Sequence, residues 1–519
     1  MAVNAIMGSY LPLLRRFGLC AVLICLTTTL VSTRASAQSE SSEFEVWNAL
    51  NKQTIGLFQE GLFEDAEAAA RSALIQAETH LQDHSAELGS SHFNLGAVLQ
   101  RLGKYDEASA AHQNALAIRL AMDPVNDHDI ATSLESIAET EQANGNARSA
   151  AEFYRRAVGA KSALGQDTFF VQRGHAYALF GLDDRSSDET LEALDAMRHA
   201  LATYGDRKSD NLVAYANDLA NAIQLARTGE RLFDVVDLAQ ELVDLRRAER
   251  PQDAYELGWA YRYLAETHET ADDIAGAETA YRAAISQMEK LEGGLNYNVS
   301  NFSFALGDLL ETAGRYAEAE RAFRQTLVVE QQIYGDAHEE TLRTYNRLGL
   351  LLHNDGRYFP SEVLLRRGLA LSETVHGPDA LWTATIADNL ALALTGLGRL
   401  NDAIPLHRRA LGIRQDQLGR VNETTSKTVN NLALALEATG NTEEARELFR
   451  EALNTDRQTL PEGSWEIGVA LTNLADSLVV QGTPSALAEA YDYLQEALDI
   501  TRLNYPPKHA NIAEALDSL

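Results

Sequence analysis

The residues best suited to bind a metal ion are His80 and His84, which lie one helical turn apart and would share one face of a helix. Asp83 lies between them and His92 follows. Two histidines at this spacing can share a zinc ion, but a structural or catalytic zinc site takes three or four protein ligands. No third ligand stands at a diagnostic distance. We therefore favour solvent-exposed histidines and expect no metal and no cofactor.

An acidic segment with Asp123, Asn126, Asp127 and Asp129 is a second place where a cation could bind. It lacks the ordered ligand spacing and the glycine of a calcium-binding loop. We expect it instead to begin a helix, with Asp129 as the N-terminal cap.

Motifs of the common enzyme classes are missing from the sequence. We find no Gly-rich phosphate loop with Lys and Ser/Thr, no Gly-x-Ser-x-Gly and no His-Glu-x-x-His. Cys20 and Cys25 both lie in an N-terminal segment that we expect to be removed, which would leave no thiol nucleophile and no disulfide. The sequence therefore predicts a protein that is not an enzyme.

Regularly spaced glycines reveal how the chain is organised. Successive members are separated by 42, 42, 84, 85, 42, 42, 42 and 42 residues. A fixed period in this range predicts a solenoid, whose units bury their apolar faces only by stacking on each other. Function is then expected on a long surface. The glycines are Gly61, Gly103, Gly145, Gly229, Gly314, Gly356, Gly398, Gly440 and Gly482.

The residues around each glycine predict a helical hairpin. Pairs such as Leu95-Gly96 and Leu432-Ala433 stand eight and seven residues before it, and alanines recur five and twelve residues after it. Small residues suit helices that approach closely, and the glycine ends the first helix by adopting a left-handed conformation.

This pattern resembles the tetratricopeptide repeat, most clearly in NLGAVLQRLGKYDEASAAHQNALAI from Asn94 and NLALALTGLGRLNDAIPLHRRALGI from Asn389. The basic repeat of that family has 34 residues, and the longer period resembles the kinesin-light-chain type. The likeness covers nearly all of the chain after residue 43. It implies an all-α, right-handed superhelical solenoid of about eleven hairpins, followed by a half-repeat from Ala510 to Leu519.

The expected organisation is a signal peptide (1–37), a short linker (38–43), regular repeats (44–162), divergent repeats (163–297) and regular repeats with the half-repeat (298–519). In the divergent part Ser187 and Asp272 replace the glycine, and Leu219 stands ten residues before Gly229 instead of eight. Either the superhelical path changes here or the sequence has drifted. We favour drift, because arrays held by nearest-neighbour contacts tolerate imperfect members.

The N-terminus has the order of a secretory signal: Arg15-Arg16, an apolar run over residues 17–31, and Ala35-Ser36-Ala37 before Gln38. An uncleaved anchor is the alternative, but the run is shorter than the roughly 20 residues that span a bilayer. We expect an exported protein, in the periplasm of a Gram-negative bacterium, whose mature part does not insert into a membrane.

The charge excludes a partner class. The net charge is −31, and removing a signal with three arginines and no acid leaves 41 basic and 75 acidic residues, or −34. Such an excess would repel nucleic acid. The simplest explanation of the negative charge is a solvated outer face, and the more specific one is that the charge attracts a basic partner.

Family resemblance also implies where a ligand binds. In the family, the first helix of each hairpin lines the concave side through residues about 13, 10, 6, 3 and 2 positions before the turn. Asparagines nine positions before the turn form a ladder that could bond an extended peptide, or instead bond across neighbouring hairpins. Among the concave positions, the two bases Arg343 and Lys427 with Asn346 and Asn430 suggest a peptide with negative charge or a free carboxylate. The concave residues are Arg101, Arg343, Asn346, Asn354, Asp388, Lys427, Asn430 and Asp476, and the ladder is Asn94, Asn389, Asn431 and Asn473.

Three hypotheses follow. The first is an exported, non-catalytic scaffold that binds a partner peptide or protein in its groove. The second is the recognition arm of a larger effector, such as one with a caspase-like peptidase. The third, an enzyme built from scattered groove residues, has no feature in its favour, and we prefer the first.

Overall fold

The computed structural model describes residues 39–80, 86–205, 207–210, 212–291, 294–504 and 510–517. Within these ranges the chain forms helices and no β-strand, so the all-α expectation is confirmed there. Among the described helices, none combines the length and the apolar character that crossing a membrane requires. The expected signal peptide lies outside the described residues, as do Asp83 and His84.

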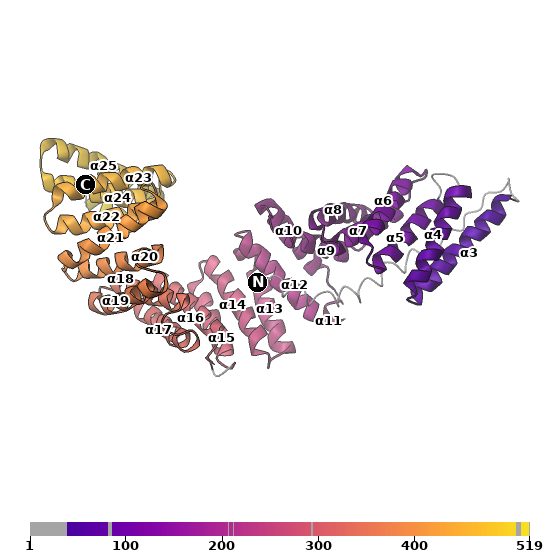
Figure 1. Cartoon of the computed structure of the whole chain (residues 1–519), viewed down its shortest axis with the longest axis horizontal. Helices are drawn as coiled ribbons and strands as arrows, with labels where there is room; N and C mark the ends of the chain where they lie inside the picture. The colour runs from indigo at the N-terminus through magenta and orange to yellow at the C-terminus, as the bar shows by residue number, and fades with distance from the viewer. Residues whose placement is uncertain are drawn as a thin grey trace. The chain divides into compact units, whose positions relative to one another are not determined.

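The chain divides into two compact units, residues 1–245 and 246–519. In the first unit, consecutive helices pack as antiparallel pairs, α3 with α4 through α9 with α10, and each pair packs on the next (Figure 1). The helices are α3 (Ser39–Gln59), α4 (Phe63–His80), α5 (Ala86–Arg101), α6 (Tyr105–Ala121), α7 (Asp127–Ala143), α8 (Ala147–Ala163), α9 (Phe169–Phe180), α10 (Ser187–Ala202), α11 (Arg207–Asp210), α12 (Leu212–Thr228), the 3-10 helix η1 (Leu232–Val235) and α13 (Val236–Glu249), which crosses the boundary.

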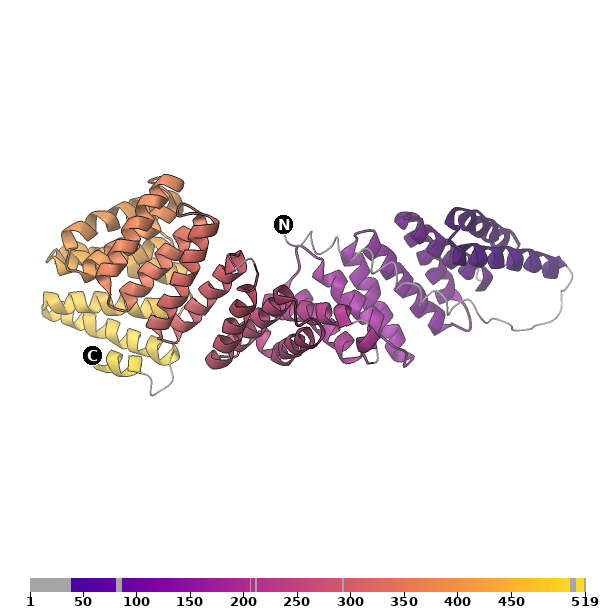
Figure 2. The ribbon, with the colours of Figure 1, turned by 90° about the horizontal axis from the view of Figure 1, so that it is seen from below.

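The second unit repeats this arrangement from α14 with α15 to α24 with α25, and the short α26 packs on α25 (Figure 2). Its helices are α14 (Ala254–Thr270), α15 (Ile274–Met288), α16 (Tyr297–Thr312), α17 (Tyr316–Ile333), α18 (Glu339–Asn354), α19 (Tyr358–Val375), α20 (Leu381–Gly396), α21 (Leu400–Leu418), α22 (Glu423–Ala438), α23 (Thr442–Thr459), α24 (Trp465–Gln481), α25 (Pro484–Asn504) and α26 (Ala510–Asp517).

The turn glycines behave as expected at every regular hairpin, where φ lies between 68° at Gly482 and 87° at Gly440. Gly229 is the exception, and the prediction for it is wrong. The left-handed residue there is Glu230, with φ 55°, and the next is Asp272, with φ 58°. Glu230 stands one period of 42 residues before Asp272 and two periods before Gly314, so the extra residue of the central spacing lies between Gly145 and Glu230 and not after Gly229.

The hairpin of α9 and α10 closes without a left-handed glycine, since Gly181, which follows α9, has φ −76°. Arg185 donates hydrogen bonds to the carbonyl oxygens of Leu179 (3.2 Å) and Phe180 (2.7 Å). Those carbonyls are among the groups that the end of a helix leaves without an intrahelical partner. Ser186 then caps α10, with Glu189 completing a capping box. A guanidinium thus stabilises the end of α9 where other copies use a left-handed glycine.

At the start of α7 the expected cap is wrong by three residues. The side-chain oxygen of Asn126 accepts from the backbone N–H groups of His128 (3.1 Å) and Asp129 (3.4 Å). Asp129 itself accepts from the Asn126 amide at 2.9 Å. Among the described residues, no group of three or more His, Cys, Asp or Glu side chains could hold a metal ion.

Close contact between the two helices of a hairpin explains the small residues before each turn. A Cβ atom added at Gly307 would lie 2.7 Å from the ring of Phe323, which stands nine residues after the turn. The equivalent distance at Gly96 is 2.7 Å to the ring of His112. A large side chain from the second helix therefore rests directly on the backbone of the first.

Ion pairs connect successive hairpins on their second helices. The cation that follows a turn pairs with a glutamate six residues after the preceding turn: Lys104 with Glu67 at 2.8 Å, and Arg399 with Glu362 at 2.7 Å. Hydrogen bonds from Lys104 and Arg71 hold the pKa of Glu67 below its ordinary value. An exposed pair such as Lys104 with Glu67 stabilises its interface by only about 0.2–1 kcal/mol.

Candidate protein-binding surface

The first helix of each hairpin presents a line of residues 13, 10, 6, 3 and 2 positions before the turn, which we call the inner stripe. A helix brings such positions onto one face. In the second unit the inner stripes belong to α14, α16, α18, α20, α22 and α24. The predicted surface residues of this unit lie on the stripes of α18, α20, α22 and α24.

The ladder asparagines bond across neighbouring hairpins. Asn389 donates a hydrogen bond from its side-chain amide to the side-chain oxygen of Asn346 at 2.8 Å, and Asn473 donates to Asn430 at 2.9 Å. We call these two contacts the amide pairs. In the first unit, Asn94 donates to Asn51 at 2.6 Å in the same way. The sequence allowed two interpretations of the ladder, and these contacts match the one in which the asparagines bond across neighbouring hairpins. Whether a ligand also reaches these side chains stays a prediction.

A further ladder member was missed by sequence reasoning. Asn221 donates to the hydroxyl of Tyr177 at 2.8 Å, with a separation of 44 residues against 43 in the other copies. It stands nine residues before Glu230, the residue that makes the turn. Counting back 42 residues from Asp272, instead of using Gly229, would have found it.

Asp388 does not line an open surface, so that prediction is wrong. Its side chain is buried, with 4% of the residue exposed. Nδ1 of His407 lies 2.6 Å from its Oδ1, and its Oδ2 accepts from Arg414 at 3.0 Å and from Asn431 at 3.3 Å. Burial by itself would raise the pKa of Asp388, but its contacts with His407 and Arg414 outweigh burial and hold the pKa below its ordinary value.

The two bases predicted to attract an acidic ligand already have carboxylate partners. Arg343 pairs with Glu340 at 2.7 Å and lies over the ring of Phe304, 4.2 Å from its centre. Lys427 pairs with Glu423 at 2.6 Å.

Arg347, which the sequence did not single out, occupies a ladder position in place of asparagine. It binds Asp308 at 2.8 Å and Glu311 at 3.0 Å. Asn354, a predicted residue near the turn, donates to the same Glu311 at 3.2 Å. The positive charges of α18 are thus neutralised within the chain.

Two acids on the stripes of α22 and α24 lack such compensation. Asp476 is exposed as a residue, but its carboxylate is partly shielded from water. This partial burial raises the pKa of Asp476, and the nearby Glu437 raises it further. Oε1 of Glu437 is buried and has no hydrogen-bond partner among the described residues.

In the first unit, Arg101 lies beside the ring of Phe58, 5.8 Å from its centre, and close to Glu139. Burial and the adjacent Glu135 raise the pKa of Glu139 to about 8, although Lys161 and Arg101 oppose the rise. Arg101, which was predicted to line the concave side, therefore lies near the carboxyl group of Glu139, which keeps its proton near neutral pH.

Apolar side chains share the inner stripes, and sequence reasoning overlooked them. Leu350, Leu392 and Leu434 each stand six residues before a turn, and Leu434 is 40% exposed. On α24, Val479 and Val480 are exposed as well. The recurrence of leucine every 42 residues was the available signal.

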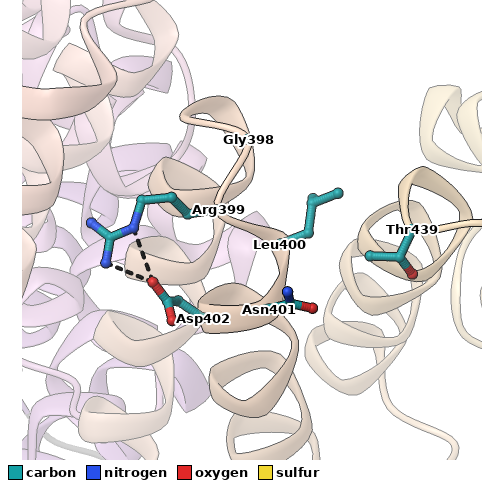
Figure 3. A pocket seen from close by; sticks show the side chains of 6 residues that line it. All are labelled: Gly398, Arg399, Leu400, Asn401, Asp402 and Thr439. Atoms are coloured by element: carbon teal, nitrogen blue, oxygen red, sulfur yellow. Dashed lines mark hydrogen bonds and ion pairs between the residues drawn. The ribbon is translucent and has the colours of Figure 1, made fainter.

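Away from the inner stripes, a shallow hollow lies at the edge formed by two neighbouring turns (Figure 3). Its Arg399 side chain bends onto Asp402, 2.6 Å away, and also bonds Glu362 at 2.7 Å. We assign it no ligand, because its one cation is already paired twice. The lining residues are Gly398, Arg399, Leu400, Asn401, Asp402 and Thr439.

Among solved structures, the crystal structure of BtubC (BKLC) from P. vanneervenii is similar, with 19% identity over 44% of this chain and 91% of that chain and a TM-score of 0.38. A putative kinesin light chain of Podosopora anserina with nearly identical TPR-like repeats has 19% identity over 39% and 95%, with a TM-score of 0.34. The Cut9-Hcn1 hetero-tetramer of the APC/C has 13% identity over 91% and 96%, with a TM-score of 0.37. These likenesses are weak and carry no functional argument.

No curated protein matches the chain. The family model described as "Tetratricopeptide repeat" matches residues 87–163, 299–374, 340–416 and 382–458. These segments contain the hairpins that turn at Gly103 and Gly145 in the first unit and at Gly314, Gly356, Gly398 and Gly440 in the second. The chain therefore contains tetratricopeptide repeats.

Proposed function

We propose that this protein is an exported, non-catalytic scaffold that binds a partner polypeptide along the inner stripes of its first helices. Tetratricopeptide repeats are in general a fold for protein–protein interaction, and the stripes supply a long row of side chains on successive helices. Fold alone does not decide function, so the proposal rests on the groups that these stripes present.

The observation that carries the proposal is the geometry of the amide pairs. In each pair one amide N–H bonds one side-chain oxygen, and all four asparagines are only half-buried. The oxygen of Asn389 and the amide N–H groups of Asn346 make no other hydrogen bond among the described residues. An extended peptide backbone offers one donor and one acceptor per residue, so each amide pair can satisfy both.

Photo-crosslinking in intact cells tests the binding surface. A photoreactive residue at Leu434, on the stripe of α22 and one turn from Asn430, should give a discrete adduct with a protein that mass spectrometry identifies. The matched control is Phe359, which is exposed on the second helix α19. The identified protein, once purified, should bind the chain and compete with the crosslink. Adducts at position 359 alone would contradict the proposal.

The location is tested separately. Export predicts that the chain is found in the periplasmic fraction and that its N-terminus, read by mass spectrometry, is Gln38. A chain that keeps residues 1–37 and sediments with membranes would support the anchor alternative instead.

A further inference from the structure

Exposed apolar side chains stand on the adjacent inner stripes of α22 and α24. Leu434 lies on α22, and Val469, Val479 and Val480 lie on α24, with Val480 66% exposed. Single exposed aliphatic side chains are ordinary on protein surfaces. Several on neighbouring stripes indicate a contact surface for another molecule. We refer to these four residues as the aliphatic area.

Unpaired negative charge borders the aliphatic area. Glu437 follows Leu434 on the same helix, and Asp476 precedes Val479 by three residues and Val480 by four, which is about one turn. The two carboxylates are close enough that Glu437 raises the pKa of Asp476, after the larger effect of burial. Among the described residues neither acid has an ion pair, and Oε1 of Glu437 is buried without any hydrogen-bond donor.

The single base on these two stripes is surrounded by acids. Lys427 pairs with Glu423 at 2.6 Å. A hydrogen bond from Ser464 lowers the pKa of Glu466, and Lys427 adds to that effect. Burial raises the pKa of Asp456, and Lys427 offsets part of the rise. The positive charge of Lys427 is therefore shared among several carboxylates, and the surface as a whole is negative.

The excess of acidic side chains predicts a basic ligand, whereas the sequence suggested an acidic peptide. An acidic peptide would meet Glu437 and Asp476 without compensation, whereas a cation placed between them would relieve their repulsion. A buried carboxylate oxygen without a donor costs free energy until a donor reaches it. A partner side chain that carries an ammonium or guanidinium group supplies that donor.

We propose that the aliphatic area and its two acids bind a partner segment in which Lys or Arg stands beside aliphatic side chains. The cation lies between Glu437 and Asp476, and the aliphatic side chains contact Leu434, Val479 and Val480. This inference rests on the proposed function, since it names the chemistry of the polypeptide that the inner stripes bind.

The test is selection of a random twelve-residue peptide library on the full chain, followed by affinity measurements with the enriched peptides. We expect enriched peptides to combine Lys or Arg with Leu, Ile or Val. Replacing the peptide's basic residue by glutamine should weaken binding at least tenfold. The E437Q/D476N variant should abolish that tenfold difference, because the basic residue then has no counter-charge.

Two further variants make each outcome decisive. E447Q/E451Q removes two charges from the second helix α23 and should leave binding unchanged; L434S/V480S should weaken all enriched peptides. If L434S/V480S weakened binding of the enriched peptides while E437Q/D476N left the tenfold difference unchanged, the charge preference would be wrong and the proposed function would stand. Enrichment of acidic peptides would also overturn it. If no peptide were enriched, or if none depended on either stripe, both the inference and peptide binding by these stripes would be contradicted.

Discussion

Nδ1 of His407 lies 2.6 Å from Oδ1 of Asp388, and both side chains are buried. His407 stands nine residues after its turn and Asp388 ten residues before it. In the hairpin of α5 and α6 the same two positions hold His112 and Phe93, whose rings lie 5.1 Å apart edge to face. The same pair of positions in the repeat thus holds a hydrogen-bonded contact in one copy and a ring contact in another.

The first prediction concerns Asp388. Replacing it with alanine leaves the guanidinium of Arg414 buried without a counter-charge and Nδ1 of His407 without its partner, which should cost about 3–5 kcal/mol. Hydrogen exchange of the α20–α22 backbone should show this loss as easier local opening. Asp388→Asn keeps the hydrogen-bond acceptor and should cost less. Glu447→Ala, on the exposed side of α23, is the control. An effect of Asp388→Ala no larger than that of the control would refute the structural role.

The second prediction concerns His112 and acid. Both ring nitrogens are buried without a partner, and burial, followed by the charge of Arg119, lowers the pKa of this histidine to about 3. The unfolded chain binds a proton near pH 6.5 while the folded chain does not, so this histidine makes stability fall as the pH drops from about 6.5 to 3, by up to about 1.4 kcal/mol per pH unit.

His112→Phe removes that proton uptake and keeps a ring over Gly96. Denaturant titrations at pH 7, 5.5 and 4.5 should therefore show a smaller loss of stability for His112→Phe than for the natural chain. Equal losses at all three pH values would show that His112 is not the group responsible.

The third prediction is a coupling energy within an amide pair. Asn346→Ala and Asn389→Ala each remove the same 2.8 Å hydrogen bond, so the double variant should cost little more than either one. A double-mutant cycle should give a coupling of about 0.5–1.5 kcal/mol, the net value of one such bond. Strict additivity would mean that the two amides do not interact in solution.

The fourth prediction contrasts two glycines. Gly307→Ala places a Cβ atom 2.7 Å from the ring of Phe323 and should destabilise the α16–α17 hairpin by about 1–3 kcal/mol. Gly412 lies inside α21, and a Cβ atom there meets nothing within 4 Å. Gly412→Ala should therefore stabilise the chain by up to about 1 kcal/mol through the helix preference of alanine. Thermal unfolding curves of the two variants should shift in opposite directions.

The sequence by itself determined the hairpin, its period and its turns wherever the requirement is local. A left-handed residue must end each first helix, and a small residue must stand under the large side chain of the second helix. Both requirements select particular residue types at fixed distances from turn residues such as Gly314 and Gly398. The same reasoning failed at Gly229, because Glu230 adopts the left-handed conformation although glutamate is not a residue type that indicates it.

Only the tertiary structure decided which polar residues of the first helices stay available. Asp388 and Asn346 occupy equivalent positions ten residues before a turn, so the sequence places both on the same face. Asp388 is buried because His407 and Arg414 reach it from the second helix. In the hairpin of Asn346 those two positions hold Leu365 and Ser372, so Asn346 has only its contact with Asn389 and stays half-buried. The partners come from other helices, and their charge and size determine how much of each side chain remains open to water.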